Sequence, residues 1–125
     1  MAKKKILIID DEKDLTQMIK MNLEQAGQFQ VKVENSARNV VPVAEVFQPN
    51  LIFMDVIMPE MSGGEVAQNL KDNESTKNIP IVFLTATILK EEVSREGTLI
   101  GGRPFLAKPA DINEILECIK KYATE

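Results

Sequence analysis

Three short runs of continuous apolar residues constrain the fold of this chain more than any other feature. They are ILII at residues 6–9, LIFM at 51–54 and IVFL at 81–84. Strands with one exposed face alternate apolar and polar residues, whereas strands covered on both faces, as in a parallel sheet, are apolar throughout. We therefore expect these runs to be the central strands of a parallel sheet. The weaker runs 29–33 and 105–107 are expected nearer its edges.

The segments between the strands have a helical period. Apolar residues recur at i, i+3 and i+4 across residues 15–26 and again across 112–119, and Gly27 stands where a helix C-cap is expected. A strand-helix unit repeated five times predicts a flavodoxin-like α/β fold, a doubly wound five-stranded parallel sheet in a three-layer (βα)5 sandwich. With 125 residues and 44% hydrophobic content, residues 1–125 are expected to form one domain with one core.

Helix starts have recognisable signals in three places. Ser62 and Asp111 are each followed three residues later by a glutamate, which is the spacing of a capping box. Pro42 fits a second helix if Asn39 is its N-cap, because a proline in the first turn loses no hydrogen bond.

Composition excludes several classes of protein. The net charge of -4 comes from interspersed signs, which argues against a nucleic-acid groove. The apolar run behind the basic start has only four residues, too few for a signal peptide, and no later run could span a bilayer. The single cysteine cannot form an internal disulfide. We therefore expect a cytoplasmic protein without membrane contact.

The chain contains no histidine. A histidine general base, a histidine metal ligand and a phosphohistidine are all excluded. Aspartate, threonine, serine and lysine must carry any chemistry.

A polar residue closes each strong apolar run. In doubly wound sheets ligands bind beyond the carboxyl ends of the strands, so these residues should share one crevice. They are Asp10 and Asp11, Asp55, Thr85 and, after the weaker last run, Lys108. Each has an ordinary explanation when taken alone: a helix N-cap for the aspartate pair, a turn hydroxyl for the threonine and a solvated loop position for the lysine.

The carboxylates together predict a metal site. Three of them in one crevice repel one another by roughly 4 kcal/mol per pair at about 4 Å and an effective dielectric near 20. One lysine cannot offset that repulsion, but a hard divalent cation can, and magnesium prefers an all-oxygen site with room for water and a phosphate. We therefore predict Mg²⁺ at Asp10, Asp11 and Asp55, and a phosphorylated substrate.

The acceptor of that phosphoryl group is predicted to be Asp55. A carboxylate can attack phosphorus and form an aspartyl-phosphate. The cation and Lys108 would then neutralise phosphoryl oxygens, and the Thr85 hydroxyl would donate a hydrogen bond to one of them. Ser62, Gly63 and Gly64, which follow the acceptor, are interpreted as a turn and helix start.

Four ordered motifs resemble the receiver domains of two-component response regulators. They are ILIIDDE, LIFMDVIMPEMSGGE, IVFLTA and FLAKP, and the resemblance covers roughly residues 4–122. It implies that Asp55 takes a phosphoryl group from a histidine kinase or a histidine phosphotransfer protein. It also implies that Asp11, Asp55 and the backbone carbonyl of Ile57 bind Mg²⁺ directly, while Asp10 acts mainly through water.

The resemblance implies an output switch as well. Thr85 and Lys108 would contact the phosphoryl group, and the Lys108–Pro109 peptide would be cis. Phosphorylation would draw Thr85 inward and let Phe105 turn in, which would reshape the face made by the fourth helix, the fifth strand and the fifth helix. Glycine and proline within residues 97–104 should weaken the fourth helix and make residues 88–104 mobile.

The role that follows is a signalling phosphoacceptor that assists its own phosphorylation and dephosphorylation, and not an enzyme. The expected partners are the phosphoryl donor and a downstream protein target or tethered output domain, with no nucleic acid bound by this domain. Whether it is a stand-alone regulator or part of a longer chain stays open.

Three alternatives are weaker. A magnesium-dependent phosphohydrolase with an aspartyl nucleophile needs an acid two residues beyond it, where this chain has Ile57. A pseudo-receiver that binds partners without phosphorylation would not need the intact set of site residues. A flavin mononucleotide binder would have its phosphate repelled by Asp10 and Asp11.

Overall fold

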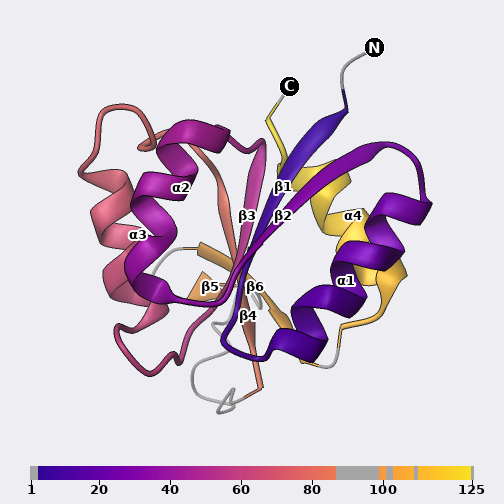
Figure 1. Ribbon diagram of the computed structural model, residues 1–125, viewed down its shortest axis with the longest axis horizontal. Helices are drawn as coiled ribbons and strands as arrows, with labels where there is room; N and C mark the ends of the chain where they lie inside the picture. The colour runs from indigo at the N-terminus through magenta and orange to yellow at the C-terminus, as the bar shows by residue number, and fades with distance from the viewer. Residues whose placement is uncertain (1–2, 87–98, 101–102, 109, 125) are drawn as a thin grey trace.

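A parallel sheet lies between two pairs of helices in the computed structural model, which describes residues 3–86, 99–100, 103–108 and 110–124. Helices α2 (Val40–Phe47) and α3 (Gly63–Lys71) cover one face, and α1 (Lys13–Gln25) and α4 (Ile112–Tyr122) cover the other (Figure 1). The three-layer sandwich is therefore confirmed. Within the described residues, none of the helices has the length and apolar character that a membrane span requires.

The sheet has the order β2-β1-β3-β4-β6-β5. In chain order the strands are β1 (Lys4–Ile9), β2 (Phe29–Glu34), β3 (Leu51–Asp55), β4 (Ile81–Thr85), β5 (Leu99–Ile100) and β6 (Arg103–Ala107). The five longer strands pair in parallel, as expected for a doubly wound sheet. Because β1 has β2 on one side and β3 on the other, the strand order reverses there, and the carboxyl ends of β1 and β3 border the crevice where ligands bind in such sheets.

The short strand β5 was not predicted. Leu99 pairs antiparallel with Pro104, and Ile100 pairs with Arg103, so this two-residue strand extends the sheet beyond β6. Proline is compatible with this position because an edge pairing needs few backbone N–H donors. The expected fourth helix, and the mobility predicted for it, fall largely on residues 87–98 and 101–102, which lie outside the described residues.

Two hydrophobic clusters fill the spaces between the sheet and the helices. Strand β3 contributes to both by alternation: Ile52 and Met54 face α2 and α3, whereas Leu51 and Phe53 face α1 and α4. All four of these side chains are at most 1% exposed. The strand is thus covered on both faces, which is why its sequence is continuously apolar.

The predicted helix ends are largely confirmed. The Ser62 side chain accepts a hydrogen bond from the backbone N–H of Glu65 at the start of α3, and Asp111 forms a complete capping box at the start of α4. Gly27 follows the end of α1 with φ +83°, a left-handed conformation that glycine adopts without strain. Asn39 does hold the N-cap position of α2, but its side chain makes no capping bond, because a short 3₁₀ turn leads into the helix.

Candidate functional site

Two aspartates at neighbouring strand ends are buried. Asp10 directly follows β1 and is 0% exposed, and Asp55 ends β3 and is 7% exposed. The pairing of Ile9 with Met54 sets the two strand ends side by side. A carboxylate in such a position loses most of its hydration and needs charged or hydrogen-bonding partners.

The third carboxylate comes from the residue after Asp10. Asp11 is exposed, and one oxygen each from Asp10, Asp11 and Asp55 lie within 4.8 Å of one another. The capping interpretation of Asp10 and Asp11 does not apply to α1, whose N-cap is Glu12 without a side-chain capping bond. Instead, Asp10 Oδ1 accepts the backbone N–H of Glu12 at 2.9 Å, a bond that holds the turn after β1.

Lys108 joins these acids from the end of β6. Its Nζ lies 2.6 Å from Oδ2 of Asp10, 3.0 Å from Oε1 of Glu12 and 3.5 Å from Oδ2 of Asp55. The lysine side chain is only 10% exposed. The sequence places it in the crevice, but its contact with Glu12 was not predicted; that residue follows the acidic pair directly, and its position could have suggested the contact.

Burial and mutual repulsion shift the protonation of the cluster. Burial raises the pKa of Asp10, although Lys108 and the Glu12 N–H act against it. Burial likewise raises the pKa of Asp55, and the charge of Asp10 raises it further. For Lys108, burial acts to lower the pKa, but the contacts with Asp10 and Glu12 outweigh it and raise the pKa above the ordinary value. The lysine is therefore held fully protonated.

The donor set fits a hard divalent cation. Asp10 Oδ2 is fully buried, and within the described residues its one close polar contact is the ammonium of Lys108. One carboxylate oxygen from each of Asp10, Asp11 and Asp55 lies within 4.8 Å of the other two, so the three can all face one ion. Mg²⁺ prefers oxygen ligands and usually keeps several of its bound waters. A set of carboxylate oxygens with one exposed member therefore suits this ion, because the exposed side leaves space for those waters.

The two predicted switch residues lie on neighbouring strands. Thr85 ends β4 and is 2% exposed, and its carbonyl accepts the backbone N–H of Lys108 at 2.8 Å. Phe105 on β6 pairs in register with Phe83 and is half-buried against the cluster beneath α2 and α3. The backbone bond ties the hydroxyl residue to the lysine. Pro109 lies outside the described residues, and so does the predicted cis peptide.

The loop after Asp55 has a close backbone contact that the sequence interpretation missed. The Gly63 N–H donates to the carbonyl of Val56 at 2.7 Å, and a Cβ at Gly63 would overlap the carbonyl oxygen of Asp55. Glycine therefore lets the first turn of α3 pack directly on the acceptor strand. Gly64 has no such restriction, since its added Cβ would meet only Ser62 Oγ at 3.8 Å. The two consecutive glycines in the sequence could have suggested a close backbone contact. The sequence does not show which of the two glycines makes it.

Ile57, two residues after the acceptor, has an exposed side chain (64%), and its backbone hydrogen-bonds to the Asp55 carboxylate. Asn35, which was not predicted, supports Asp10: its amide donates to the carbonyl of Asp10 at 2.7 Å and to Thr16 Oγ1 at 3.1 Å. Asn35 ties the end of β2 to the turn after β1. Nothing in the sequence distinguishes it from an ordinary loop asparagine.

Comparison with known proteins agrees with this geometry. A model of the response regulator receiver domain matches residues 6–120. The polar-differentiation response regulator DivK of Brucella ovis is 32% identical over 121 residues, which cover 95% of each chain. The Vibrio cholerae chemotaxis protein CheY4 has a structure with TM-score 0.83 and 28% identity, covering 97% of this chain and 99% of its own. The receiver domain of the Pseudomonas aeruginosa sensor histidine kinase PA1611, solved with a magnesium ion coordinated in its active-site cleft, has TM-score 0.82 and 26% identity, covering 97% and 98%.

Proposed function

Because the chain belongs to the response regulator receiver domain family, a family of signalling modules in two-component systems, we propose that it receives a phosphoryl group on Asp55 and passes the signal on by a change of conformation. Residues 1–125 would act as one receiver domain. The observation that carries the proposal is the position of Asp55: a buried carboxylate at a strand end, within reach of two further carboxylates and one lysine.

The carboxylate of Asp55 is the nucleophile in this proposal. One of its oxygens forms a bond to phosphorus while the bond between phosphorus and the donor nitrogen breaks. Since the chain has no histidine, a donor imidazole has to come from another protein, a histidine kinase or a phosphotransfer protein. Burial and the nearby charge of Asp10 raise the pKa of Asp55, and the positive charge of a bound cation would lower it again.

Mg²⁺, held by Asp11, Asp55 and the backbone carbonyl of Ile57 with Asp10 acting through water, would supply positive charge to the phosphoryl oxygens. Lys108 would contribute a second positive charge, for which it must loosen its contacts with Asp10 and Glu12. The Thr85 hydroxyl, from the neighbouring strand end, would donate a hydrogen bond to a phosphoryl oxygen.

The same two residues would link the site to the output. Because the Thr85 carbonyl accepts the Lys108 N–H, a shift of either residue moves the end of both strands. Phe105 lies on the second of these strands and is only partly buried, and in this proposal it would turn inward when Thr85 moves. The surface around β6 and α4 would then bind a downstream protein or a tethered output domain.

Phosphorylation by a small donor tests the proposal. The intact protein is incubated with acetyl phosphate and Mg²⁺, and its mass is measured. We expect the mass to increase by one phosphoryl group. No increase is expected when EDTA replaces Mg²⁺ in the incubation, or in Asp55→Asn. Asp72→Asn, which changes an exposed carboxylate at the end of α3, is the matched control and should be labelled like the wild type.

Two outcomes would contradict the proposal. An unchanged mass, while a known receiver domain is labelled in parallel, would favour a phosphorylation-independent binding module. Repeated turnover of a small phosphate ester that depends on Asp55 would favour a phosphohydrolase, although the exposed apolar side chain of Ile57 offers no acid for a leaving group.

A further inference from the structure

Helix α2 is more apolar than its position explains. Glu45 is the only polar residue among its eight. Val40 and Ala44 are fully buried against the sheet, yet Val46 is 88% exposed. A helix that is apolar on all sides is normally covered on more than one side. One face of α2 is therefore left in contact with solvent.

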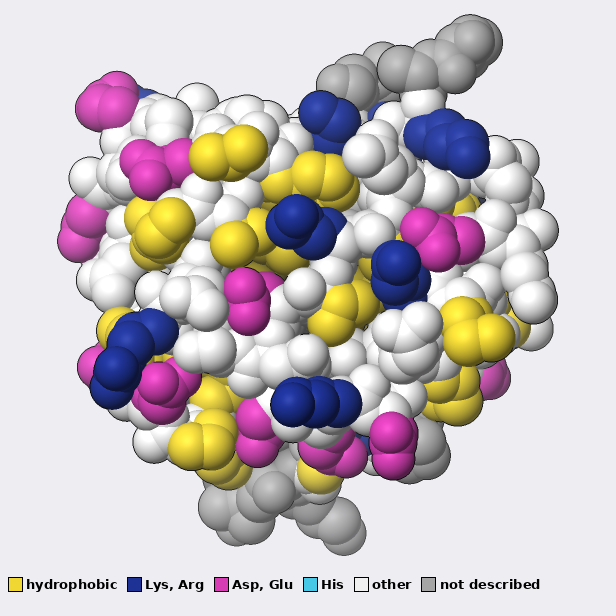
Figure 2. Space-filling view, in the orientation of Figure 1, with side chains coloured by type: hydrophobic (Ala, Val, Ile, Leu, Met, Phe, Trp, Pro, Cys, Tyr) yellow, Lys and Arg dark blue, Asp and Glu magenta, His cyan; other side chains and the backbone are white. Residues whose placement is uncertain are grey.

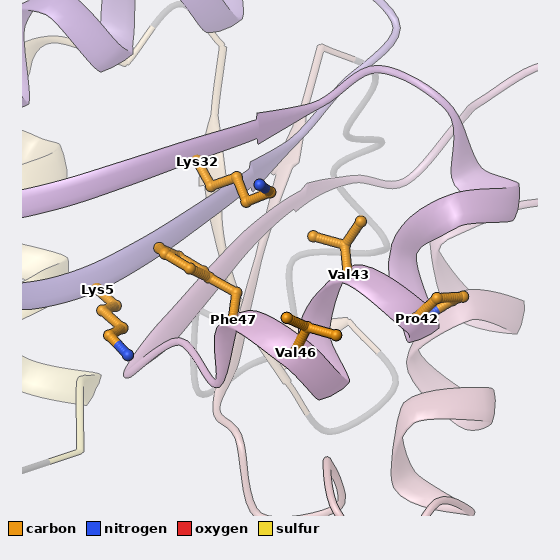
Figure 3. Close-up of a pocket in the computed structure, with 6 residues that line it drawn as sticks. All are labelled: Lys5, Lys32, Pro42, Val43, Val46 and Phe47. Atoms are coloured by element: carbon orange, nitrogen blue, oxygen red, sulfur yellow. The ribbon is translucent and has the colours of Figure 1, made fainter.

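That face borders a groove of about 390 Å³. Its lining consists of Pro42, Val43, Val46 and Phe47 from α2, with Lys5 from β1 and Lys32 from β2. Figure 3 shows the Phe47 ring between the two lysines, and Val43 and Val46 projecting from the helix beside it. The groove thus has an apolar side formed by the helix and a basic side formed by the strands.

The groove exists because the helix layer stops before the edge of the sheet. Among the described residues, the cluster beneath α2 and α3 takes its strand side chains from β1, β3, β4 and β6 and none from β2. On β2, the side chains that alternate to this face begin with Gln30 and Lys32, and both are exposed. Figure 2 shows hydrophobic side chains between α2 and the two strands, bordered by lysine or arginine side chains.

No acidic residue lines the groove, and the acid next along this face of β2, Glu34, accepts the backbone N–H groups of Asn35 and Ser36. In the part of the chain that the structure describes, Lys32 makes no ion pair, and the Lys5 ammonium lies over the Phe47 ring, 5.7 Å from the ring centre. The chain as a whole is acidic, with net charge -4. Two lysines beside an apolar helix face are therefore a local feature, and their charge complements a ligand that is apolar and acidic.

We propose that this groove binds an acidic amphipathic helix of a partner protein. Helices pack side by side at about 8–10 Å between their axes, so a helix placed next to α2 would lie over the uncovered face of β2. Its apolar stripe would contact Val43, Val46 and Phe47, and carboxylates beside the stripe would reach Lys5 and Lys32. A second copy of this chain fits poorly, because a symmetric contact through the groove would bring the two lining lysines of each copy together, and no acidic residue is among the lining residues.

A displayed library of helical peptides tests the proposal on the full chain. Leucines are fixed at i, i+3, i+4 and i+7, and the flanking positions are randomised among Glu, Lys, Gln and Ser. Peptides are selected on the wild type and counter-selected on Val46→Glu, whose exposed position allows the substitution without disturbing the core. We expect enrichment of Glu beside the leucine stripe, and amide shifts in α2 and β2 when a selected peptide is added.

Matched variants define the outcome. Val46→Glu and Lys32→Glu should each weaken a selected peptide at least tenfold, whereas Lys20→Glu, on the helix layer across the sheet, should change its affinity less than twofold. All three should still be phosphorylated by acetyl phosphate, which separates this proposal from the function of Asp55. The proposal would be overturned by enrichment of Lys, by no enrichment, or by equal binding of the selected peptides to Val46→Glu. It would also be overturned if laurate, a simple fatty acid, produced the amide shifts without any peptide. A dimer of the protein that Val46→Glu dissociates would assign the groove to a second copy of the chain instead.

Discussion

The ammonium of Lys108 lies closer to Asp10, at 2.6 Å, than to the proposed acceptor Asp55, at 3.5 Å. The lysine is therefore first a partner of the more deeply buried acid. It is the main positive charge that makes the burial of Asp10 tolerable, and the proposed role at the phosphoryl group requires it to leave that position.

Lys108→Ala should destabilise the protein by about 3 kcal/mol, because it removes the one counter-charge that the described part of the chain supplies to the buried carboxylate of Asp10. Urea unfolding without added metal measures the effect, and Mg²⁺ should recover part of the loss. Lys77→Ala removes an exposed ion pair with Glu74 and should change stability by less than about 0.5 kcal/mol. Equal effects of the two substitutions would contradict this account.

Asp11→Ala should weaken Mg²⁺ binding at least tenfold with little change in stability, since the Asp11 side chain is exposed and supports no other residue that the structure describes. The chain has no tryptophan, so the affinity is measured by calorimetry or by amide shifts. Asp14→Ala, in the first turn of α1, is the control and should retain nearly full affinity. An unchanged affinity in Asp11→Ala would remove this residue from the metal site.

Acidification should stabilise the metal-free site. The pKa values of Asp10 and Asp55 are raised from the ordinary 3.8, so the native state binds their protons at a higher pH than the unfolded state does. This contribution to stability is fully present below pH 3.8 and is lost as pH rises through the folded pKa values.

The measurement is the free energy of unfolding from pH 7 down to pH 4, in EDTA, for the wild type and for the double variant Asp10→Asn, Asp55→Asn. Other carboxylates contribute to both proteins and cancel in the difference. The wild type should gain stability relative to the double variant on acidification, and saturating Mg²⁺ should abolish or reverse that gain. A relative loss at low pH would contradict the raised pKa values.

Gly63→Ala should destabilise the protein by about 2 kcal/mol, because the added Cβ forces the start of α3 away from the Asp55 carbonyl. The same displacement should slow phosphorylation by acetyl phosphate. Gly64→Ala is a matched control one residue later, where the added Cβ has space and alanine is the better helix former by about 1 kcal/mol. In thermal unfolding, the melting temperature should therefore fall in Gly63→Ala and rise in Gly64→Ala.

The central strands and the site edge could be predicted from sequence because both depend on local patterns. A strand buried on both faces must be apolar throughout, and its carboxyl end must face the crevice, so Asp10, Asp55 and Thr85 follow from their positions alone. The capped starts of α3 and α4 also follow from short motifs.

The features that sequence did not predict depend on contacts between distant segments. The contact of Lys108 with Glu12 joins residues 96 positions apart, and the support of Asp10 by Asn35 joins two separate loops. The constraint on Gly63 depends on how closely α3 approaches β3. The short strand β5 pairs through backbone atoms, which leave no pattern in the side chains.

The alternation of β3 between two hydrophobic clusters limits which changes in this strand can be tolerated. Substitutions among apolar residues alter only volume, and neighbouring side chains can adapt to them. Insertion or deletion of one residue would instead reverse every side chain between the two clusters and also displace Asp55 by one position. Related proteins should therefore vary in the composition of this strand while keeping its length constant.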